Sequence, residues 1–264
     1  MELIDSHCHL DISPLADTLE DTLSRARQAG VTRMITIGID YPSSAEAVRL
    51  AHRHAGVFAT VGLHPHSAAE GDQELYDRLA ALARDPWVVA YGEIGLDYAK
   101  NYSPRERQLA AFAEQLDLAA ELGLPVVIHD RDAHADTMRL LRSRAPFPAG
   151  GIMHCFSGDT GLAREVLDLG FYISIPGVVT FKNGRLLQEV VSSVPLDRML
   201  LETDAPFLAP VPFRGKTNRP EYLVHIGRKV AELKGVSLEA VARQTSDNAF
   251  RLFNLPKSDG PHDQ

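Results

Sequence analysis

The stretch RERQLAAFAEQLDLAAELGLPVVIH, residues 105–129, contains a helix and a strand in direct succession. Its first part is helical in pattern and closes at Gly123, and a glycine commonly follows the end of a helix. The short apolar run PVVIH, residues 125–129, has the character of a buried strand and ends at a histidine. The same order of helix and strand is repeated along the chain, and this repetition decides the predicted fold.

Apolar, β-rich runs alternate with amphipathic helical segments from end to end of the sequence. The strand candidates are ELIDSH (2–7), RMITIGI (33–39), VFATVGL (57–63), VVAYGE (88–93), PVVIH (125–129), GGIMH (150–154), FYISI (171–175) and MLLETD (199–204). Eight strands with helices between them predict an α/β fold, a single-domain (β/α)8 TIM barrel over residues 1–256. An open doubly wound sheet is the alternative, but its glycine-rich phosphate turn after the first strand is missing. The polar tail, residues 257–264, is predicted to be disordered.

Composition narrows the class of protein further. The chain has 264 residues and a net charge of −8, from 27 Lys and Arg against 35 Asp and Glu. This balance excludes a general nucleic-acid-binding surface, so attraction for a nucleic acid must be local or come from metal ions. No apolar run reaches the roughly 18 residues of a membrane span, and the N-terminus does not resemble a secretory signal. We therefore expect a cytoplasmic protein without membrane contact, and nothing in the sequence indicates an obligate protein partner.

Six residues with metal-binding side chains follow or end five of the predicted strands. They are His7, His9, Glu93, His129, His154 and Asp204. Active sites of barrels are built at the carboxyl ends of their strands, so these side chains are expected to converge on one rim. The sequence therefore predicts that all six are metal ligands.

Strand periodicity assigns roles to the neighbours of these residues. Side chains two apart point the same way, so His7 and His9 can meet one ion while Cys8 faces away. Asp5 has the same parity one layer lower and is predicted to support a ligating histidine. Glu202 is predicted to lie below Asp204 and to hydrogen-bond an arginine or a ligating histidine. The two cysteines, Cys8 and Cys155, are expected to be reduced.

Four imidazoles and two carboxylates exceed what one catalytic ion requires, since a catalytic zinc commonly takes three protein ligands. The sequence therefore predicts two divalent ions bridged by Glu93. His7, His9, Glu93 and Asp204 would then hold one ion, and Glu93, His129 and His154 the other. Imidazole suits zinc, whereas carboxylate and water suit magnesium or manganese, so the identity of the metal stays open.

The residues resemble a known family, the TatD-type metal-dependent deoxyribonucleases of the amidohydrolase-like barrels. The matching motifs are DSHCH (5–9), GLHPH (62–66), GEIGLDY (92–98), PVVIHDRDA (125–133), MHCFSG (153–158), LETDAPFLAPVPFRGKTNRP (201–220) and TSDNAFRLF (245–253). Seven motifs in the family's order cover nearly the whole chain. The resemblance implies a divalent-metal-dependent phosphodiesterase acting on DNA, with the family's metal ligands at the six residues already named.

Phosphodiester hydrolysis needs an activated water and stabilisation of charge on the phosphate oxygens, and two metal ions can supply both. We expect Glu93 and Asp204 to be the catalytic carboxylates, with Asp204 accepting the proton of the attacking water. The expected activity is that of a deoxyribonuclease, specifically an exonuclease on single-stranded ends.

Several residues are predicted to contact the substrate. Loops after the last strands of a barrel often hold phosphate, and the loop after the eighth strand carries Arg214, Lys216 and Arg219. Arg131 directly follows the fifth strand, and His64 follows the third. Asp97 in GLDY is expected either to orient a ligand or to form a turn.

Three other functions remain open at this point. A related barrel hydrolase could cleave a small ester, lactone or amide, although many such enzymes bridge their metals with a carboxylated lysine, and no lysine ends a predicted strand here. Removal of D-amino acids from mischarged tRNA is also an ester cleavage. A catalytically silent metal-binding scaffold is the third alternative.

Overall fold

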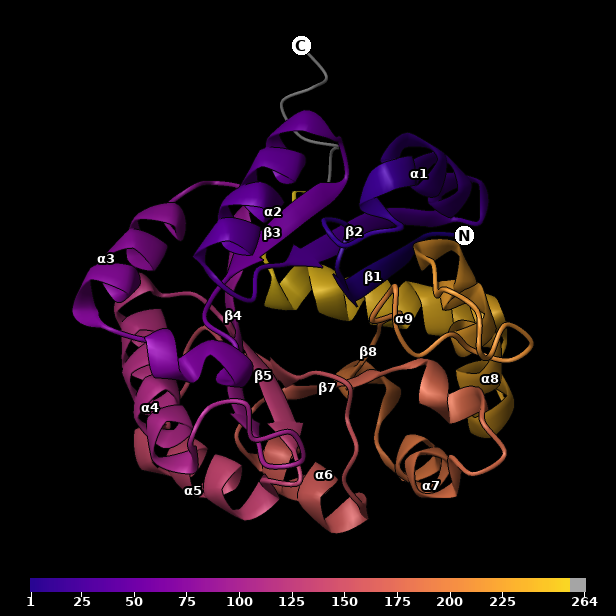
Figure 1. Cartoon of the computed structure of the whole chain (residues 1–264). Helices are drawn as coiled ribbons and strands as arrows, with labels where there is room; N and C mark the ends of the chain where they lie inside the picture. Colours follow the sequence, from indigo (N-terminus) through magenta and orange to yellow (C-terminus); the bar gives the residue numbers. More distant parts are fainter. Residues whose placement is uncertain (257–264) are drawn as a thin grey trace.

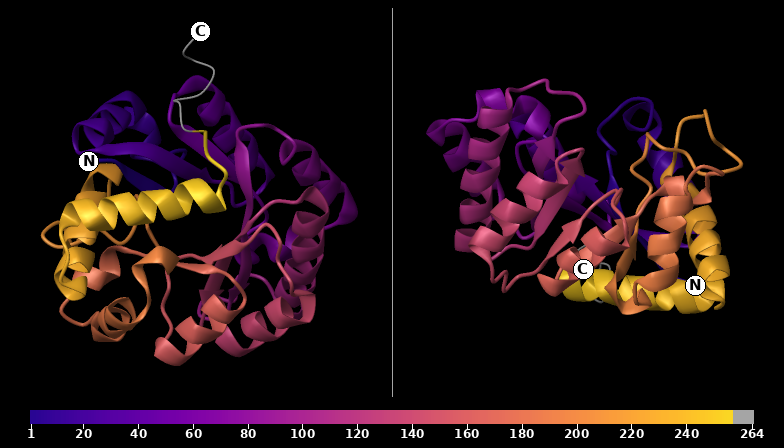
Figure 2. Two further views of the ribbon diagram at one scale, coloured as in Figure 1. Left: turned by 180° about the vertical axis from the view of Figure 1, so that it is seen from behind. Right: turned by 90° about the horizontal axis from the view of Figure 1, so that it is seen from below.

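The computed structural model describes residues 1–256 and shows the predicted barrel (Figure 1). Eight parallel strands form one sheet, and each pairs with the next along the chain. Helices surround the strands as an outer layer (Figures 1 and 2). The strands are β1 (Leu3–Cys8), β2 (Val31–Ile37), β3 (Val57–Val61), β4 (Val88–Asp97), β5 (Val126–Arg131), β6 (Gly151–Met153), β7 (Tyr172–Ile175) and β8 (Met199–Leu201).

Nine α-helices lie within residues 1–256, and most of them connect consecutive strands. They are α1 (Leu19–Gln28), α2 (Tyr41–Arg53), α3 (Gln73–Leu82), α4 (Arg105–Leu122), α5 (His134–Arg144), α6 (Thr160–Asp168), α7 (Arg185–Ser193), α8 (Leu223–Lys234) and α9 (Leu238–Leu252). Short 3₁₀ turns are η1 (Ala16–Thr18), η2 (Pro65–Glu70), η3 (Gly177–Thr180), η4 (Leu196–Arg198) and η5 (Pro220–Tyr222).

Local sequence signals account for where several helices begin and end. Helix α2 begins with a capping box, because the Asp40 carboxylate accepts a hydrogen bond from the Ser43 backbone N–H (2.8 Å) and the Ser43 hydroxyl accepts one from the Asp40 N–H (3.0 Å). Helix α4 ends at Gly123 as predicted, with a φ of +66° that favours glycine.

Helix α9 runs across the amino ends of the strands, as the view from behind shows (Figure 2). The Ser246 hydroxyl donates to the carbonyl of Glu2 (3.1 Å), just before β1. The Asn248 side chain donates to the carbonyls of Leu196 (2.9 Å) and Met199 (2.8 Å), at the start of β8. These contacts anchor α9 at the end of the barrel opposite the predicted site.

The barrel closes between β8 and β1 through the segment that follows β8. The backbone N–H of His9 donates to the carbonyl of Ala205 (2.7 Å), and that of Asp204 donates to the carbonyl of His7 (2.9 Å). Ser6 adds a hydroxyl hydrogen bond to the carbonyl of Leu201 (2.9 Å). The closure therefore brings the loop after β8 directly beside the histidines of β1.

The predicted ends of β4 and β8 differ most from the structure. Strand β4 continues past Glu93 to Asp97, with a register shift against β5 between Tyr91 and Ile94. Gly95 permits the continued pairing, because its φ is +143° and a Cβ there would lie 2.0 Å from the carbonyl oxygen of His129. Strand β8 ends at Leu201, and the chain then turns, with Asp204 in the left-handed region at a φ of +55°.

No helix within residues 1–256 is long and apolar enough to cross a bilayer. Cys8 and Cys155 are free thiols, and Cys8 is buried as predicted for a residue facing away from the site. The predicted tail, residues 257–264, lies outside the described residues.

Candidate metal centre

The six predicted ligands meet at the carboxyl end of the barrel, and we call them the ligand cluster: His7, His9, Glu93, His129, His154 and Asp204. Three contacts span it. His9 Nε2 lies 3.5 Å from Asp204 Oδ1, and His7 Nε2 lies 3.4 Å from Glu93 Oε2. His154 Nε2 lies 2.8 Å from Glu93 Oε1. The structure thus brings together residues that are far apart along the chain.

Glu93 occupies the middle of the cluster, and its two carboxylate oxygens face different imidazoles. Oε2 is directed at His7, whereas Oε1 lies 2.7 Å from His129 Nδ1 and 2.8 Å from His154 Nε2. The register shift in β4 falls at this residue, and such an irregularity re-aims a strand side chain. One carboxylate can therefore serve two groups of ligands.

Charge partners hold the central groups in defined ionisation states. Burial alone would raise the pKa of Glu93, but the neighbouring imidazoles of His154 and His64 hold it well below its usual range. Burial alone would lower the pKa of His154, but the carboxylates of Glu93 and Glu202 raise it well above its usual range. Protons and a divalent cation would therefore compete for the same positions in the cluster.

Asp204 reaches the cluster from the loop after β8 rather than from a strand. Burial would raise its pKa, but hydrogen bonding to His9 and the charge of His7 lower it. The carboxylate is therefore ionised at neutral pH. Because Asp204 has a positive φ, the strand parity that was expected to place Glu202 below it does not apply, and the turn itself aims the Asp204 side chain.

Asp5 is buried one layer below, as predicted, but its carboxylate does not contact an imidazole. Oδ2 accepts a hydrogen bond from the Thr203 hydroxyl (2.5 Å), and Oδ1 accepts from the backbone N–H of Thr203 (2.9 Å) and of His7 (3.3 Å). Asp5 therefore contacts His7, a predicted ligand, through the backbone and not through the ring. Asp5 positions the loop that carries Asp204, across the closure of the barrel.

Asp97, at the end of β4, makes contacts that fit both of the roles that the sequence left open. Its Oδ2 lies 3.2 Å from His129 Nε2, so the opposite nitrogen, Nδ1, faces Glu93. Its Oδ1 accepts hydrogen bonds from the backbone N–H groups of Ala99 (3.0 Å) and Lys100 (2.9 Å), which form a turn. Carboxylates that orient a ligating imidazole in this way are common around protein metals.

Glu202 faces His154, so of the two partners that the sequence left open, an arginine or a ligating histidine, its neighbour is the histidine. Its Oε1 accepts a hydrogen bond from the backbone N–H of Cys155 (2.7 Å) and lies 3.6 Å from His154 Nδ1. The His154 ring also stacks on His7, with centroids 3.8 Å apart and planes at 10°. These contacts leave Nε2 of His154 facing Glu93.

The donor set fits a divalent metal. Both ring nitrogens of His7, Nδ1 of His9 and Nδ1 of His154 are buried without a hydrogen-bond partner, which is costly for polar atoms unless another ligand satisfies them. Imidazole and carboxylate together suit divalent first-row ions. Three groups of side chains within residues 1–256 bring ligand atoms within 4.8 Å of one another: His7, His9 and Asp204; His7, His154 and Glu202; and His64, Glu93 and His129.

A family described as TatD related DNase matches residues 4–254 of the chain. The chain belongs to the TatD family. It is therefore a metal-dependent hydrolase acting on ester bonds, and the resemblance seen in its motifs is confirmed.

Relatives within the TatD family have different degrees of characterisation. The chain is 40% identical to an uncharacterized metal-dependent hydrolase, YabD, of Bacillus subtilis (strain 168), over 96% of this chain and 99% of the relative. It is 38% identical to a 3'-5' ssDNA/RNA exonuclease, TatD, of Klebsiella pneumoniae (strain 342), over 96% and 98% of the two chains. The crystal structure of YjjV, a TatD homologue from Escherichia coli, superposes with a TM-score of 0.91 at 33% identity, covering 96% of this chain and 98% of that one.

His64, predicted to bind substrate, lies within reach of the ligand cluster of this TatD-family chain. Its Nε2 is 3.4 Å from Glu93 Oε1, and its Nδ1 accepts a hydrogen bond from the backbone N–H of His66 (3.1 Å). Burial lowers its pKa to about 4, so the ring is neutral at pH 7 and carries its proton on Nε2. Ligation through Nε2 would require the proton to move to Nδ1 and would break the hydrogen bond from His66, so the geometry favours a hydrogen-bond donor.

The basic residues predicted to contact the substrate are mostly exposed. Arg131 ends β5. Burial raises the pKa of the Cys155 thiol, beside His154, and the charge of Arg131 opposes this rise. Lys216 is exposed on the loop after β8, and the Arg214 guanidinium lies 4.5 Å from the centroid of the Phe181 ring. Arg219 is half-buried, with Nη1 buried and unpaired, and differs in this from the other three.

Sequence reasoning missed three residues that position the TatD-family site. His66 Nε2 donates to Asp97 Oδ2 (2.8 Å), and its place two residues after His64 in GLHPH was the available signal. Thr203 is the partner of Asp5, and nothing in its local sequence indicated this. Asn218 donates from Nδ2 to the carbonyls of Thr203 (2.7 Å) and Phe207 (2.6 Å), which holds the loop after β8.

Proposed function

We propose that this TatD-family hydrolase cleaves the phosphodiester bonds of DNA from single-stranded ends, using two divalent ions bridged by Glu93. The observation that carries the proposal is the division of the Glu93 oxygens, with Oε2 toward His7 and Oε1 toward His129 and His154. Its relatives named 3'-5' ssDNA/RNA exonucleases support the choice of substrate and a 3'-5' direction.

His7, His9 and Asp204 would hold one ion with Glu93, and His129 and His154 would hold the other. Bound there, such ions lower the pKa of water and neutralise charge developing on the phosphate oxygens. The metal is magnesium, manganese or zinc in this proposal, since the mixed donors suit each of them.

Asp204 would accept the proton of the attacking water. Its carboxylate is kept ionised by His9 and His7, and it is the least enclosed carboxylate of the cluster, with its side chain 13% exposed against 4% for Glu93. A general base must be ionised and must be reachable by the water it deprotonates, and Asp204 meets both conditions.

His64 would donate its Nε2 proton as a hydrogen bond to an oxygen of the phosphate group. It is fixed in this tautomer by the backbone N–H of His66. Arg131, Arg214 and Lys216 would supply the local positive charge that a chain of net charge −8 otherwise lacks. A cytoplasmic location is part of the proposal, and the two free cysteines are compatible with a reducing compartment.

Degradation of end-labelled oligonucleotides tests the proposal. Single- and double-stranded DNA and RNA, labelled at either end, are incubated with magnesium, manganese or zinc, alongside an aminoacyl ester and a lactone. We expect progressive shortening of 5'-labelled single-stranded DNA that stops in EDTA. Turnover of the aminoacyl ester or the lactone with no cleavage of any oligonucleotide would overturn the proposal.

A further inference from the structure

Among residues 1–256, the exposed aromatic side chains are Tyr102, 68% exposed, and Phe207, 48% exposed. Large apolar side chains in water often mark a binding surface when they lie together with a functional site. Tyr102 follows β4 and Phe207 follows β8, and these strands stand opposite each other in a barrel of eight strands in sequential order. Both loops lie at the carboxyl end, where the ligand cluster is.

Each of the two rings lies edge-to-face against a histidine of the site. Phe207 packs on His9, with ring centroids 5.9 Å apart and planes at 69°. Tyr102 packs on His66, with centroids 4.7 Å apart and planes at 82°. His66 in turn shares Asp97 with His129, through contacts of 2.8 and 3.2 Å. The exposed aromatics therefore stand on opposite sides of the ligand cluster, with one histidine of the site behind each.

The backbone holds Phe207 in place. Its N–H donates to the carbonyl of Asp204 (2.8 Å), and its carbonyl accepts from the Asn218 side chain (2.6 Å). Leu208 and Val211 are also exposed, by 37% and 45%, so the loop after β8 presents a short apolar strip to solvent. An ordered and exposed ring next to a buried polar centre is a stacking platform available without rearrangement.

On the Tyr102 side, the flanking residue Ser103 is anchored. Its hydroxyl donates to the carbonyl of His66 (2.7 Å) and accepts from the backbone N–H of Ala69 (3.0 Å). Its carbonyl accepts from the Gln108 side chain (2.9 Å). The loop after β4 is therefore tied to the same segment as His66, which keeps the Tyr102 ring over that histidine.

We propose that Tyr102 and Phe207 form two nucleobase subsites that stack unpaired bases on either side of the phosphate being cleaved. Every base offers an aromatic face, and stacking on a protein ring contributes about 1–3 kcal/mol per base without regard to sequence. Bases within a duplex are stacked on each other and cannot reach separate rings. The two platforms thus select single strands, and this inference rests on the proposed function.

Kinetics with and without bases test the subsites. Wild-type protein and the variants Tyr102→Leu and Phe207→Leu are compared on a short single-stranded DNA and on the same strand carrying abasic residues beside the cleaved phosphate. We expect each leucine variant to raise KM for the intact strand by about tenfold, with a smaller change in kcat. On the abasic strand, the variants and wild type should have similar KM values.

The ratio of the two KM values is measured within one protein preparation, so a partial folding defect cancels. Tyr102→Phe and Phe207→Tyr, which keep the rings, should restore the wild-type ratio, and Leu186→Ala, an exposed apolar position on α7, is the matched control. An equal effect of the leucine variants on both strands, or none on either, would overturn the subsites. Failure of wild type to cleave any oligonucleotide would instead overturn the proposed function itself.

Discussion

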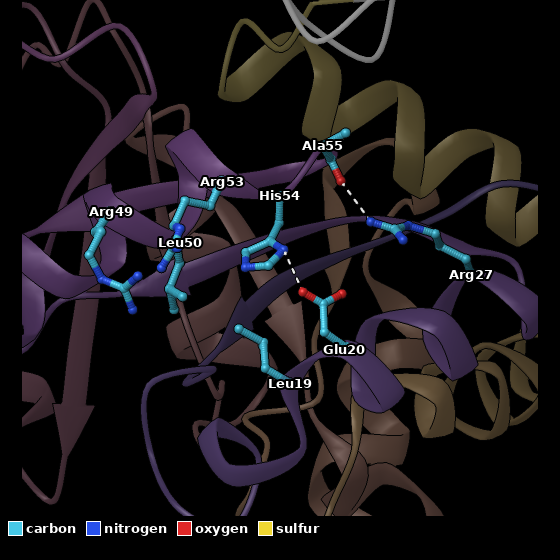
Figure 3. Close-up of a pocket in the computed structure, with 8 residues that line it drawn as sticks. All are labelled: Leu19, Glu20, Arg27, Arg49, Leu50, Arg53, His54 and Ala55. Carbon is cyan, nitrogen blue, oxygen red and sulfur yellow. Dashed lines mark hydrogen bonds and ion pairs between the residues drawn. The ribbon is translucent and has the colours of Figure 1, made fainter.

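Two regions of the molecule gather histidine with charged side chains, and the prevailing charge around the histidine has the opposite sign in each. In the ligand cluster at the carboxyl end of the barrel, the imidazoles face carboxylates. In a hollow of about 500 Å³ between α1 and α2, His54 lies among arginines (Figure 3). The hollow is lined by Leu19, Glu20, Arg27, Arg49, Leu50, Arg53, His54 and Ala55.

The surroundings move the pKa values of His54 and His154 in opposite directions. Burial lowers the pKa of His54, and the charges of Arg27 and Arg53 lower it further, although Glu20 lies 3.7 Å away and opposes them. His154 is more deeply buried, yet its carboxylate neighbours raise its pKa. A histidine near charged residues is therefore a metal-ligand candidate only where the charges are negative, since a cation needs the same partners as the imidazolium.

The largest expected effect is that of Asp204→Asn. The amide preserves the shape but cannot accept the proton of the attacking water, so we expect kcat to fall by roughly 10³-fold with the fold retained. Steady-state kinetics and circular dichroism measure the two quantities. His54→Gln, in the hollow, should retain wild-type turnover. Near-normal kcat in Asp204→Asn would remove Asp204 from the reaction.

Removal of metal should lower the Tm of the protein, and a substitution in the hollow should leave this change in Tm unaltered. A ligand present at 100 times its Kd stabilises the folded state by about 2.7 kcal/mol, so loss of the ion should lower Tm by roughly 5–10 °C for a chain of this size. Thermal unfolding with and without EDTA measures the shift, and metal analysis should approach two ions per chain. His54→Gln should show the same shift. A Tm that does not change on addition of EDTA, together with full activity in EDTA, would contradict the assignment of the ligand cluster.

Glu202→Gln should weaken metal binding without removing a cluster residue. The carboxylate that faces His154 Nδ1 becomes neutral, and loss of such a supporting group commonly costs 10–100-fold in metal affinity. Equilibrium dialysis or calorimetry gives the Kd. Glu165→Gln is the matched control, because Glu165 pairs with Arg142 on the surface (2.7 Å). Equal metal affinity in both variants would show that Glu202 does not act through His154.

The smallest expected effect is the contribution of His54, in the hollow, to the pH dependence of the free energy of unfolding. When folding lowers the pKa of a histidine, the unfolded chain binds a proton more readily than the folded protein. The folded state therefore keeps its full stability above the unfolded-state pKa of about 6.5 and loses stability as the pH falls below that pKa. His54→Gln should therefore lose slightly less stability than wild type between pH 7.5 and 5.5, as measured by urea unfolding. Arg53→Gln should raise the His54 pKa in an NMR titration. A His54 resonance that titrates above its ordinary value would contradict the electrostatic contrast.

Much of the fold and the ligand cluster was predictable because the relevant signals are local. Each strand is a short apolar run that ends near a polar residue, and parallel strands bring their carboxyl ends to one rim. His7 and His9 needed only the two-residue period of a strand. The ends of β4 and β8 were less predictable, because Gly95 and Asp204 adopt positive φ values that depend on neighbouring strands.

The sequence by itself determined the order of helices and strands, the family, and the six residues that meet at the rim. Only the tertiary structure decided how they are aimed: the two directions of the Glu93 carboxylate, the bond from Asp5 to Thr203 across 198 positions of the chain, and the pairing of Asp97 with His129. The physical reason is that composition and periodicity determine which face a residue lies on. The direction of a side chain depends instead on register shifts, turns and hydrogen bonds formed when distant segments pack together.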